Sequence, residues 1–477
     1  MRQFIQEIQK SRGLSVGELS ALLGYKSQTS VARIMQDKAN MDSVTRFCQL
    51  LKENETIALT DSEASSLDRI LEKKKLGSDE YAATDTLRQF LREDPPLVDP
   101  VLADAYTGEK QTLLERYLPM QGLKITVLNC ETLPLFGALA QLTARGIAKV
   151  EHYLYSDQNL LRTVMTIRSV LPILHDENYY GAMAFCTHEE LLSNPRGILL
   201  ADVMLAEYAV EDKPYYDLVI FQNTGEGMRF SFPVGAANVH RMMDSVKAIA
   251  TPIRNAGLGG FENDYVAYIR YCSELEKDRA VYRIKPDFGM EQVPLKTWER
   301  AFRDGPLADD SIFDGMAEAL AEVFVQRQQN ALAKKQAQHH VFKQRAVWRF
   351  VRTGRLSDQF WGFDALTMKE RMETLQSVLE QHTTNPYYQV HFLKDEDAMR
   401  DDEIVFYDGL GLSIIKAGTD YNLTANHSET MVTQGQFLRV YRNFFLHSIL
   451  PYNVQPEYKT RKILMEMIEY CRTHMDE

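Results

Sequence analysis

The chain has 477 residues, of which 45% are hydrophobic and 25% charged, a composition that excludes a disordered or fibrous protein and predicts roughly two to four globular domains. Its net charge of −12 at pH 7 argues against a protein that coats nucleic acid over its whole surface, but it is compatible with one small basic module. No run of about 18 uncharged apolar residues spans a membrane, and the N-terminal stretch MRQFIQEIQK lacks the apolar core of a signal peptide, so we expect a cytoplasmic protein.

Residues 1–58 predict a small all-α domain. Apolar residues recur there at helical spacing in four groups, and each group predicts one short helix with one buried face. Ser15 and Glu18 form a capping box at the start of the second helix, and Gly24 ends that helix. Residues 1–60 contain eight Lys or Arg and six Asp or Glu, a balance of +2, so the acidity of the chain lies in the remainder.

The second and third predicted helices are joined by a tight turn, and the polar run KSQTS leads into the third. Three segments resemble the helix-turn-helix of lambda-repressor/Cro-type (XRE-family) proteins: LSVGELSALLGY (14–25), SQTSVARIMQDK (27–38) and VTRFCQLL (44–51). Across residues 3–52 the resemblance implies a five-helix bundle with residues 27–37 as the recognition helix, which enters the DNA major groove. It also implies a homodimer that reads a palindromic site.

We divide the polar residues of this module into expected base contacts and expected phosphate contacts according to where each lies in the recognition helix or in the turns around it. Gln can pair with adenine, Arg with guanine, and Ser or Thr with either base or with phosphate. The expected base contacts are Gln28, Thr29, Ser30 and Arg33. The expected phosphate contacts are Ser15, Lys26, Ser27 and Lys38. The sequence departs from the family's pattern at Met35-Gln36-Asp37, where many members have an acidic residue and a glycine, and at Gly17, where a better helix former is usual.

Residues 59–95 predict two connecting helices that act as a linker or as a dimerisation surface. Thr60 or Asp61 can cap the first of them, and Gly77 can end it. Asp94-Pro95-Pro96 then breaks the helical pattern and marks a domain boundary.

The remainder predicts a large α/β region, because strand-like stretches alternate with helical ones. The clearest strands are LKITVLNC (123–130), KVEHYLYS (149–156), YDLVIFQN (216–223) and DEIVFYDG (402–409). The segment 166–180 matches 374–388 at six of fifteen positions without a gap, and DLVIFQNTGEG resembles DEIVFYDGLGL further along the chain. Two matches in the same order favour an internal duplication with repeats at 112–305 and 357–477; generic helix–strand similarity is the alternative.

Between these repeats, residues 306–356 predict a long basic helical connector. Residues 321–355 hold eight Lys or Arg and a single acid, Glu322. This basic stretch either contacts DNA phosphates or docks on an acidic surface of the same protein. His339-His340 is expected on the polar face of the connector helix.

The α/β region contains no recognisable catalytic or metal-binding motif. GEGMRF (225–230) lacks the third glycine of a nucleotide-binding loop, and the five scattered cysteines include no CxxC pair. The segment that starts DEIVFYDG resembles the closing part of a phospholipase-D-like half, with Asn422 and Glu429 in the family's positions and Asn238 in the first copy. Because the His-x-Lys-x4-Asp signature is absent from both copies, the resemblance implies a catalytically degenerate domain. We expect no catalytic residue, no cofactor and no metal.

Together these features predict a multidomain protein: an all-α helix-turn-helix domain followed by a duplicated α/β region. The expected function is that of a sequence-specific transcriptional regulator whose C-terminal region senses an effector or oligomerises. Its expected partners are double-stranded DNA, a second copy of the chain, and a small-molecule or peptide effector. Two alternatives stay open. One is an interaction scaffold with a degenerate helix-turn-helix, and the other is a nucleic-acid- or phospholipid-acting enzyme targeted by that module.

Overall fold

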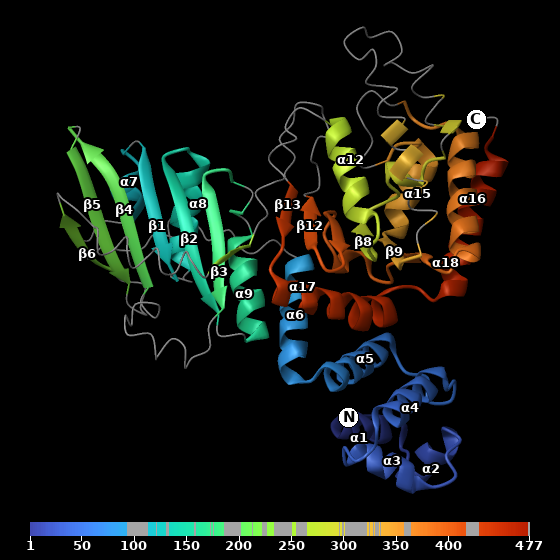
Figure 1. Ribbon diagram of the computed structural model, residues 1–477. Helices are drawn as coiled ribbons and strands as arrows, with labels where there is room; N and C mark the ends of the chain where they lie inside the picture. Colours follow the sequence, from blue (N-terminus) through green and yellow to red (C-terminus); the bar gives the residue numbers. More distant parts are fainter. Residues whose placement is uncertain are drawn as a thin grey trace.

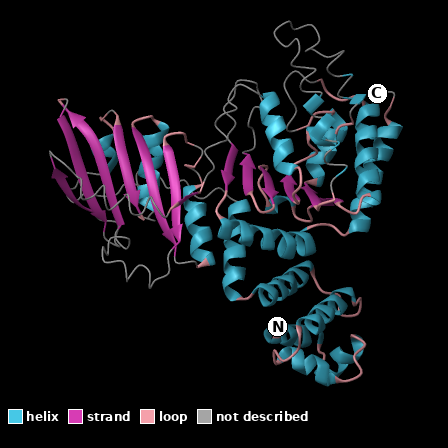
Figure 2. Cartoon of the chain, in the orientation of Figure 1, coloured by secondary structure: helices cyan, strands magenta, loops and turns pink. Residues whose placement is uncertain are grey.

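The computed structural model contains an all-α N-terminal part and an α/β body with two β-sheets (Figures 1 and 2). The residues that it describes are 1–92, 113–120, 122–129, 133–156, 159–171, 173–174, 176–185, 202–211, 213–221, 227–232, 250–253, 265–294, 296–297, 300, 322–323, 325–327, 329, 333, 335–356, 364–415 and 429–475. None of the helices within these ranges combines the length and the apolar character needed to cross a lipid bilayer.

Five helices form the N-terminal part, residues 1–76, which we call the head. They enclose one hydrophobic core around Phe47. Leu67 and Leu71 of the fifth helix are buried in this core, so the all-α unit runs to Leu76 and does not end at residue 58 as expected. The helices are α1 (Arg2–Arg12), α2 (Val16–Leu22), α3 (Gln28–Met35), α4 (Met41–Glu53) and α5 (Asp61–Leu76).

Local capping explains where the helices of the head begin and end. The Ser15 side chain accepts a hydrogen bond from the Glu18 amide while the Glu18 side chain accepts one from the Ser15 amide, which is the predicted capping box of α2. Thr60 and Glu63 form the same arrangement before α5. Gly77, with φ 83°, follows the last residue of α5, as expected for a glycine that ends a helix.

Acid is expected to weaken the contact between α5 and α1. The Arg12 guanidinium donates hydrogen bonds of 2.5 and 2.6 Å to the Glu63 carboxylate and, with the Thr60 amide, lowers the pKa of that carboxyl from 4.5 to about 2. Because the pKa is depressed in the folded protein, the stabilisation is present above the ordinary value and is lost as pH falls through about 2. An NMR titration of Glu63 checks this, and Arg12→Ala should move its pKa back towards 4.5. An ordinary pKa in the unmodified protein would show that the ion pair does not form.

The helix that follows the head belongs to the body. Helix α6 (Ser78–Arg92) buries Ala83, Leu87 and Leu91 in the core of the body. The segment 59–95, expected to be one linker, is therefore divided between head and body at Gly77. The predicted break at 94–96 lies outside the described residues.

A buried polar contact joins the two parts at this division. Arg88 of α6 donates hydrogen bonds of 2.8 Å to both carboxylate oxygens of Glu72 on α5 and to the hydroxyl of Ser448. Ser448 lies in η5 (Phe445–Asn453), a π-helix of the body. Tyr452 of the same π-helix packs against the core of the head, below Lys52 and Lys75. The head is thus held on the body by α5, α6 and η5 together.

The body contains two mixed β-sheets with matching strand order. In the first sheet the order is β6-β5-β4-β1-β2-β3-β7, and β1, β2 and β3 run parallel. In the second the order is β10-β9-β8-β11-β12-β13, and β8, β9 and β10 run parallel. In each sheet the next three strands form an antiparallel meander beside the first strand. The strands are β1 (Leu123–Leu128), β2 (Ala148–Ser156), β3 (Tyr179–Phe185), β4 (Asp202–Val210), β5 (Lys213–Phe221), β6 (Gly227–Phe232), β7 (Thr251–Pro252), β8 (Val281–Lys285), β9 (Gln338–Phe342), β10 (Tyr388–Phe392), β11 (Glu403–Tyr407), β12 (Gly411–Ile415) and β13 (Glu429–Val432).

Helices connect the parallel strands and fill the space between the sheets. Helices α6, α9 and α17 contact one another there, and one hydrophobic core includes residues of both sheets (Figure 1). Helices α12, α15, α16 and α18 pack on the second sheet, and α8 packs against β2 of the first sheet. The helices of the body after α6 are α7 (Leu113–Tyr117), α8 (Leu133–Ala144), α9 (Leu160–Val170), α12 (Tyr265–Glu276), α15 (Gln344–Thr353), α16 (Met368–Thr384), α17 (Gly435–Phe444) and α18 (Glu457–Thr473).

The first of the two internal sequence matches fits this topology and the second does not. Segment 166–180 runs from α9 into β3, and 374–388 runs from α16 into β10; both helices precede the third strand of their sheet. The match between DLVIFQNTGEG and DEIVFYDGLGL instead aligns β5, the fifth strand, with β11, the fourth. The resemblance between these two segments comes from a short apolar run that is followed by polar residues and glycine in both sequences.

The boundaries expected for the repeats and for the connector differ from those of the sheets. Strand β8 lies within 112–305 and β9 within 306–356, yet both pair with strands of 357–477. The long helix expected at 306–356 is interrupted by β9, which carries His339 and His340 on opposite faces of the sheet instead of on one helix face. Several basic side chains of this stretch pair with acids of the same chain: Arg327 with Glu276, Lys343 with Asp401, Arg345 with Asp397 and Arg349 with Asp287.

Candidate functional site

The strongest candidate site is the outer surface of α2 and α3. Leu19 and Leu23 of one helical segment and Val31 and Ile34 of the other are buried in the core of the head. Their packing sets the angle between the two helices, which are joined by a turn of residues 23–27. Both helices lie at the end of the molecule farthest from the sheets, so the body leaves this surface open (Figure 1).

All four residues expected to contact bases lie on α3 with exposed side chains: Gln28, Thr29, Ser30 and Arg33. Arg33 is in the last turn of the helix. Within the described part of the chain, no carboxylate forms an ion pair with its guanidinium, so the donors of this side chain face water. Amide, hydroxyl and guanidinium groups on one exposed helix are the groups that read base edges in a major groove.

The four residues expected to contact phosphates are also exposed. Ser15, Lys26 and Ser27 lie at the starts of α2 and α3, and Lys38 lies just after the end of α3. Ser15 and Ser27 are the N-caps of α2 and α3, and their hydroxyl oxygens accept hydrogen bonds from the Glu18 and Thr29 amides. Each hydroxyl therefore keeps its proton available for a phosphate oxygen.

The structure brings the starts of the two helices together at Gly17. A Cβ atom added at Gly17 would lie 3.8 Å from both Ser15 Oγ and Gln28 Oε1, so these two polar groups flank the same glycine. Such a Cβ would make ordinary van der Waals contact, and neither the space nor the backbone requires glycine there. Ser15 and Gln28 can thus act on neighbouring parts of one ligand.

Sequence reasoning missed Lys74 at this surface. Asp37 lies two residues after the end of α3, with φ 55° and an exposed carboxylate beside Lys38. Lys74 of α5 donates a hydrogen bond of 2.7 Å to this carboxylate and holds its pKa below the ordinary value. The pair offsets a negative charge that would repel a phosphate backbone. No local pattern indicates this contact, because the two residues are 37 positions apart and meet only when α5 joins the core of the head.

Comparison with known proteins does not assign a family to the chain. No protein-family model matches the chain, and no curated protein gives a significant match.

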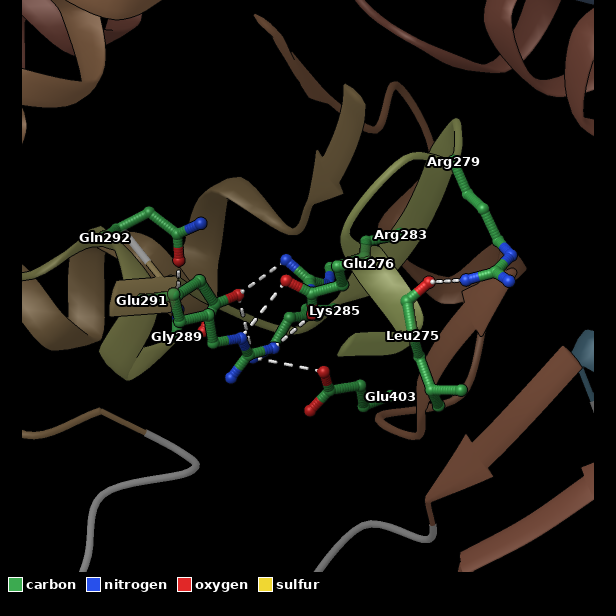
Figure 3. Close-up of polar contacts among 10 residues, drawn as sticks. Leu275, Glu276, Arg279, Arg283, Lys285, Gly289, Glu291, Gln292 and Glu403 are labelled. Atoms are coloured by element: carbon green, nitrogen blue, oxygen red, sulfur yellow. Dashed lines mark hydrogen bonds and ion pairs between the residues drawn. The ribbon is translucent and has the colours of Figure 1, made fainter. Parts of the chain in front are cut away.

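A second cluster of charged residues lies on the face of the second sheet that packs against α12 (Figure 3). It joins three cations to three carboxylates: Arg283, Lys285 and Arg327 to Glu276, Glu291 and Glu403. Glu276 accepts hydrogen bonds from both Arg283 and Arg327, the latter at 2.5 Å. Lys285 Nζ lies 3.2 Å from Glu403 and 3.6 Å from Glu291.

The charges of this cluster neutralise one another. Burial raises the pKa of Glu276, but Arg283 and Arg327 outweigh that effect and keep the pKa below its ordinary value. Burial acts in the same way on Glu291, and Lys285 and Arg283 lower its pKa well below the ordinary value. Glu276 and Glu291 are therefore ionised beside their cations at neutral pH. This balance fits a structural tie between α12, β8, η3 (Met290–Gln292) and β11 better than a general base, which needs a pKa near the working pH.

The other positions singled out in the sequence are only partly described. Asn238 and Asn422 lie outside the described residues, and Glu429 is the first residue of β13. His339 stacks on Tyr282, and its Nδ1 lies 3.1 Å from Nε2 of His391. Burial lowers the pKa of His339 to about 4 and that of His391 to about 3, so both imidazoles are neutral at physiological pH.

Proposed function

We propose that the protein binds double-stranded DNA sequence-specifically, with α3 of the head in the major groove, and acts as a transcriptional regulator. The observation that carries this proposal is the set of four exposed polar side chains on α3, whose opposite face is buried through Val31 and Ile34. A helix held in this way at the end of a molecule can enter a groove without clashing with the rest of the chain.

Charge also supports the proposal. Within residues 26–38 the exposed cations Lys26, Arg33 and Lys38 stand against one acid, Asp37, which pairs with Lys74. The acidity of the chain lies in the body, where it opposes non-specific coating of DNA. A small basic surface on an acidic protein favours binding at selected sites over binding along the whole duplex.

Selection of genomic fragments by the purified full-length protein tests the proposal. Recovery of a sequence motif that is lost in the double variant Gln28→Ala/Arg33→Ala supports it. Arg69→Ala, which removes an exposed arginine from α5, is the matched control and should keep the motif. Recovery of no motif by the full-length protein would contradict sequence-specific binding and would favour an interaction module.

Lys38→Ala is expected to weaken binding to all sequences alike. A lysine that neutralises one phosphate releases counterions on binding, so its loss should reduce the slope of log affinity against log salt by about 1. Titrations of a specific and a random duplex at several salt concentrations measure this slope. Lys369→Ala on α16 removes an exposed lysine of the body and should leave both affinities unchanged. A loss confined to the specific duplex would mean that Lys38 reads a base.

We propose further that the body controls the position of the head through the junction of α5, α6 and η5. The contact among Glu72, Arg88 and Ser448 is largely buried, so it holds a fixed geometry that a flexible tether would not. An effector bound in the body would act on the head by changing this junction, because a ligand shifts an equilibrium by its different affinity for two states.

We also infer that the two halves of the body arose by duplication. The matching strand order of the two sheets supports this inference, as does the gapless match of 166–180 with 374–388 at equivalent places in the topology. The shared order combines parallel strands with an antiparallel meander, so without duplication the same mixed arrangement would have had to arise twice.

A further inference from the structure

The outer face of α18 carries the two most exposed large hydrophobic side chains among the described residues. Tyr458 is 74% exposed and Met465 is 60% exposed. They are seven residues apart, so they lie on the same face of the helix. The opposite face of α18 is buried in the body through Ile463, Leu464 and Met467, which fixes the outer face towards solvent.

The charged residues beside this pair form a self-complementary pattern around Met465. Arg461 lies four residues before Met465 and Glu469 lies four residues after it. Tyr458 lies seven residues before it, and Arg472 seven residues after. At about 100° per residue, all of these positions fall on the exposed half of the helix. If a second α18 lies antiparallel to the first with Met465 at the centre, each charged residue of this face lies opposite a residue of opposite charge or an aromatic ring.

We propose that α18 is a self-association surface on which a second copy of this chain docks antiparallel through its own α18. Met465 then packs against the partner's Met465. Arg461 faces the partner's Glu469, and Tyr458 faces the partner's Arg472 in a cation–π contact. By the two-fold symmetry each of the last two contacts forms twice.

Opposite charges select the antiparallel arrangement over a parallel one. A parallel pair would place Arg461 against the partner's Arg461 and Glu469 against the partner's Glu469, which is unfavourable. In the single chain, Arg461 pairs with Glu457 and Arg472 with Glu469 on the surface of the helix. Exposed pairs of this kind contribute little, so they can be exchanged for contacts between chains. One helix from each partner makes a small interface, and we expect reversible dimers at micromolar concentrations.

The antiparallel arrangement of the two α18 helices also determines where the two heads of the dimer lie. Helix α18 starts at Glu457, close in sequence to η5, which contacts α5 of the head. An antiparallel pair therefore puts the two heads at opposite ends and brings together two separate duplex sites. This consequence rests on the proposed DNA binding, and it differs from the palindromic site that the family resemblance implies. The self-association itself does not depend on DNA.

Sedimentation velocity of the full-length protein over the micromolar range tests the proposal. Wild type should form dimers, and Met465→Glu should remain monomeric because it places two like charges at the centre of the pair. Met165→Glu is the matched control: Met165 is a methionine of α9 that is 53% exposed, and its replacement should leave the dimer unchanged. A monomeric wild type, or equal loss in both variants, would overturn the proposal.

Charge exchange distinguishes the antiparallel pair from other arrangements. Arg461→Glu and Glu469→Arg should each abolish the dimer, and the double variant should restore it because opposite charges again face each other. A stronger dimer in Arg461→Glu alone would contradict the antiparallel geometry. If Met465→Glu still binds single duplexes but no longer brings two duplexes together, self-association and DNA binding are separate properties. If the wild-type protein forms dimers but binds no DNA, only the proposed function of the head is contradicted.

Discussion

Replacing Arg33 with alanine is expected to weaken binding to the selected DNA sequence by about 5- to 150-fold, or roughly 1–3 kcal/mol, and to relax the base preference at one position. Arg33 is exposed in the last turn of α3, and no carboxylate of the described chain competes for its guanidinium. It can therefore donate two hydrogen bonds to the O6 and N7 atoms of a guanine, a contact that alanine cannot replace. Quantitative binding to duplexes that vary one base pair at a time measures both effects.

Arg69→Ala serves as the control for charge, because it removes one exposed arginine from the same head without touching α3. It should leave the base preference unchanged. If Arg33→Ala instead weakens every sequence equally, Arg33 contacts phosphate and the orientation of α3 in the groove differs from the one proposed. Unchanged binding in Arg33→Ala would remove α3 from the interface altogether.

Replacing Glu276 with glutamine is expected to destabilise the second sheet by about 3–5 kcal/mol. Glu276 accepts hydrogen bonds from Arg283 and Arg327, and the three side chains are largely buried. Glutamine removes the negative charge that both guanidinium groups share and leaves Glu291 as the carboxylate that pairs with Arg283. The cost arises from the desolvated cations that stay behind, more than from the hydrogen bonds that are lost.

Hydrogen exchange in β8 and α12 measures this loss locally, which is necessary because a chain with several domains has no single free energy of unfolding. Glu274→Gln is the matched control, since Glu274 lies on the same helix in an exposed pair with Lys277. That change should cost less than about 1 kcal/mol. Equal, small effects of both substitutions would show that water reaches the cluster and screens its charges.

Local patterns were sufficient for the elements of the head and for several strands. The capping boxes at Ser15 and Thr60, each with a glutamate three residues later, depend only on neighbouring residues, and the structure has both. Strands β1, β2, β5 and β11 lie where alternating or continuous apolar runs predicted them. The exposure of all eight candidate DNA contacts also agrees with the sequence, because the apolar spacing of α2 and α3 leaves only one face of each helix for solvent.

Strands β8 and β9 escaped recognition because they carry charged and imidazole side chains, which local patterns assign to solvent. VYRIK and QHHVF read as polar, solvated segments, yet all five residues of β8 are buried. Arg283 and Lys285 can be buried only because Glu276, Glu291 and Glu403 neutralise them. The expected connector helix and repeat boundaries were wrong at these strands for the same reason.

The sequence by itself thus determined the helices of the head, their caps, and the polar surface of α3, since short-range hydrogen bonds and helical periodicity decide them. Only the tertiary structure assigned α5 to the head, paired Lys74 with Asp37, and placed β8 and β9 at the centre of the second sheet. These outcomes depend on contacts between residues that are distant in sequence. Whether a charge is solvated or buried is set by the partner that folding brings to it, and a local pattern does not contain that partner.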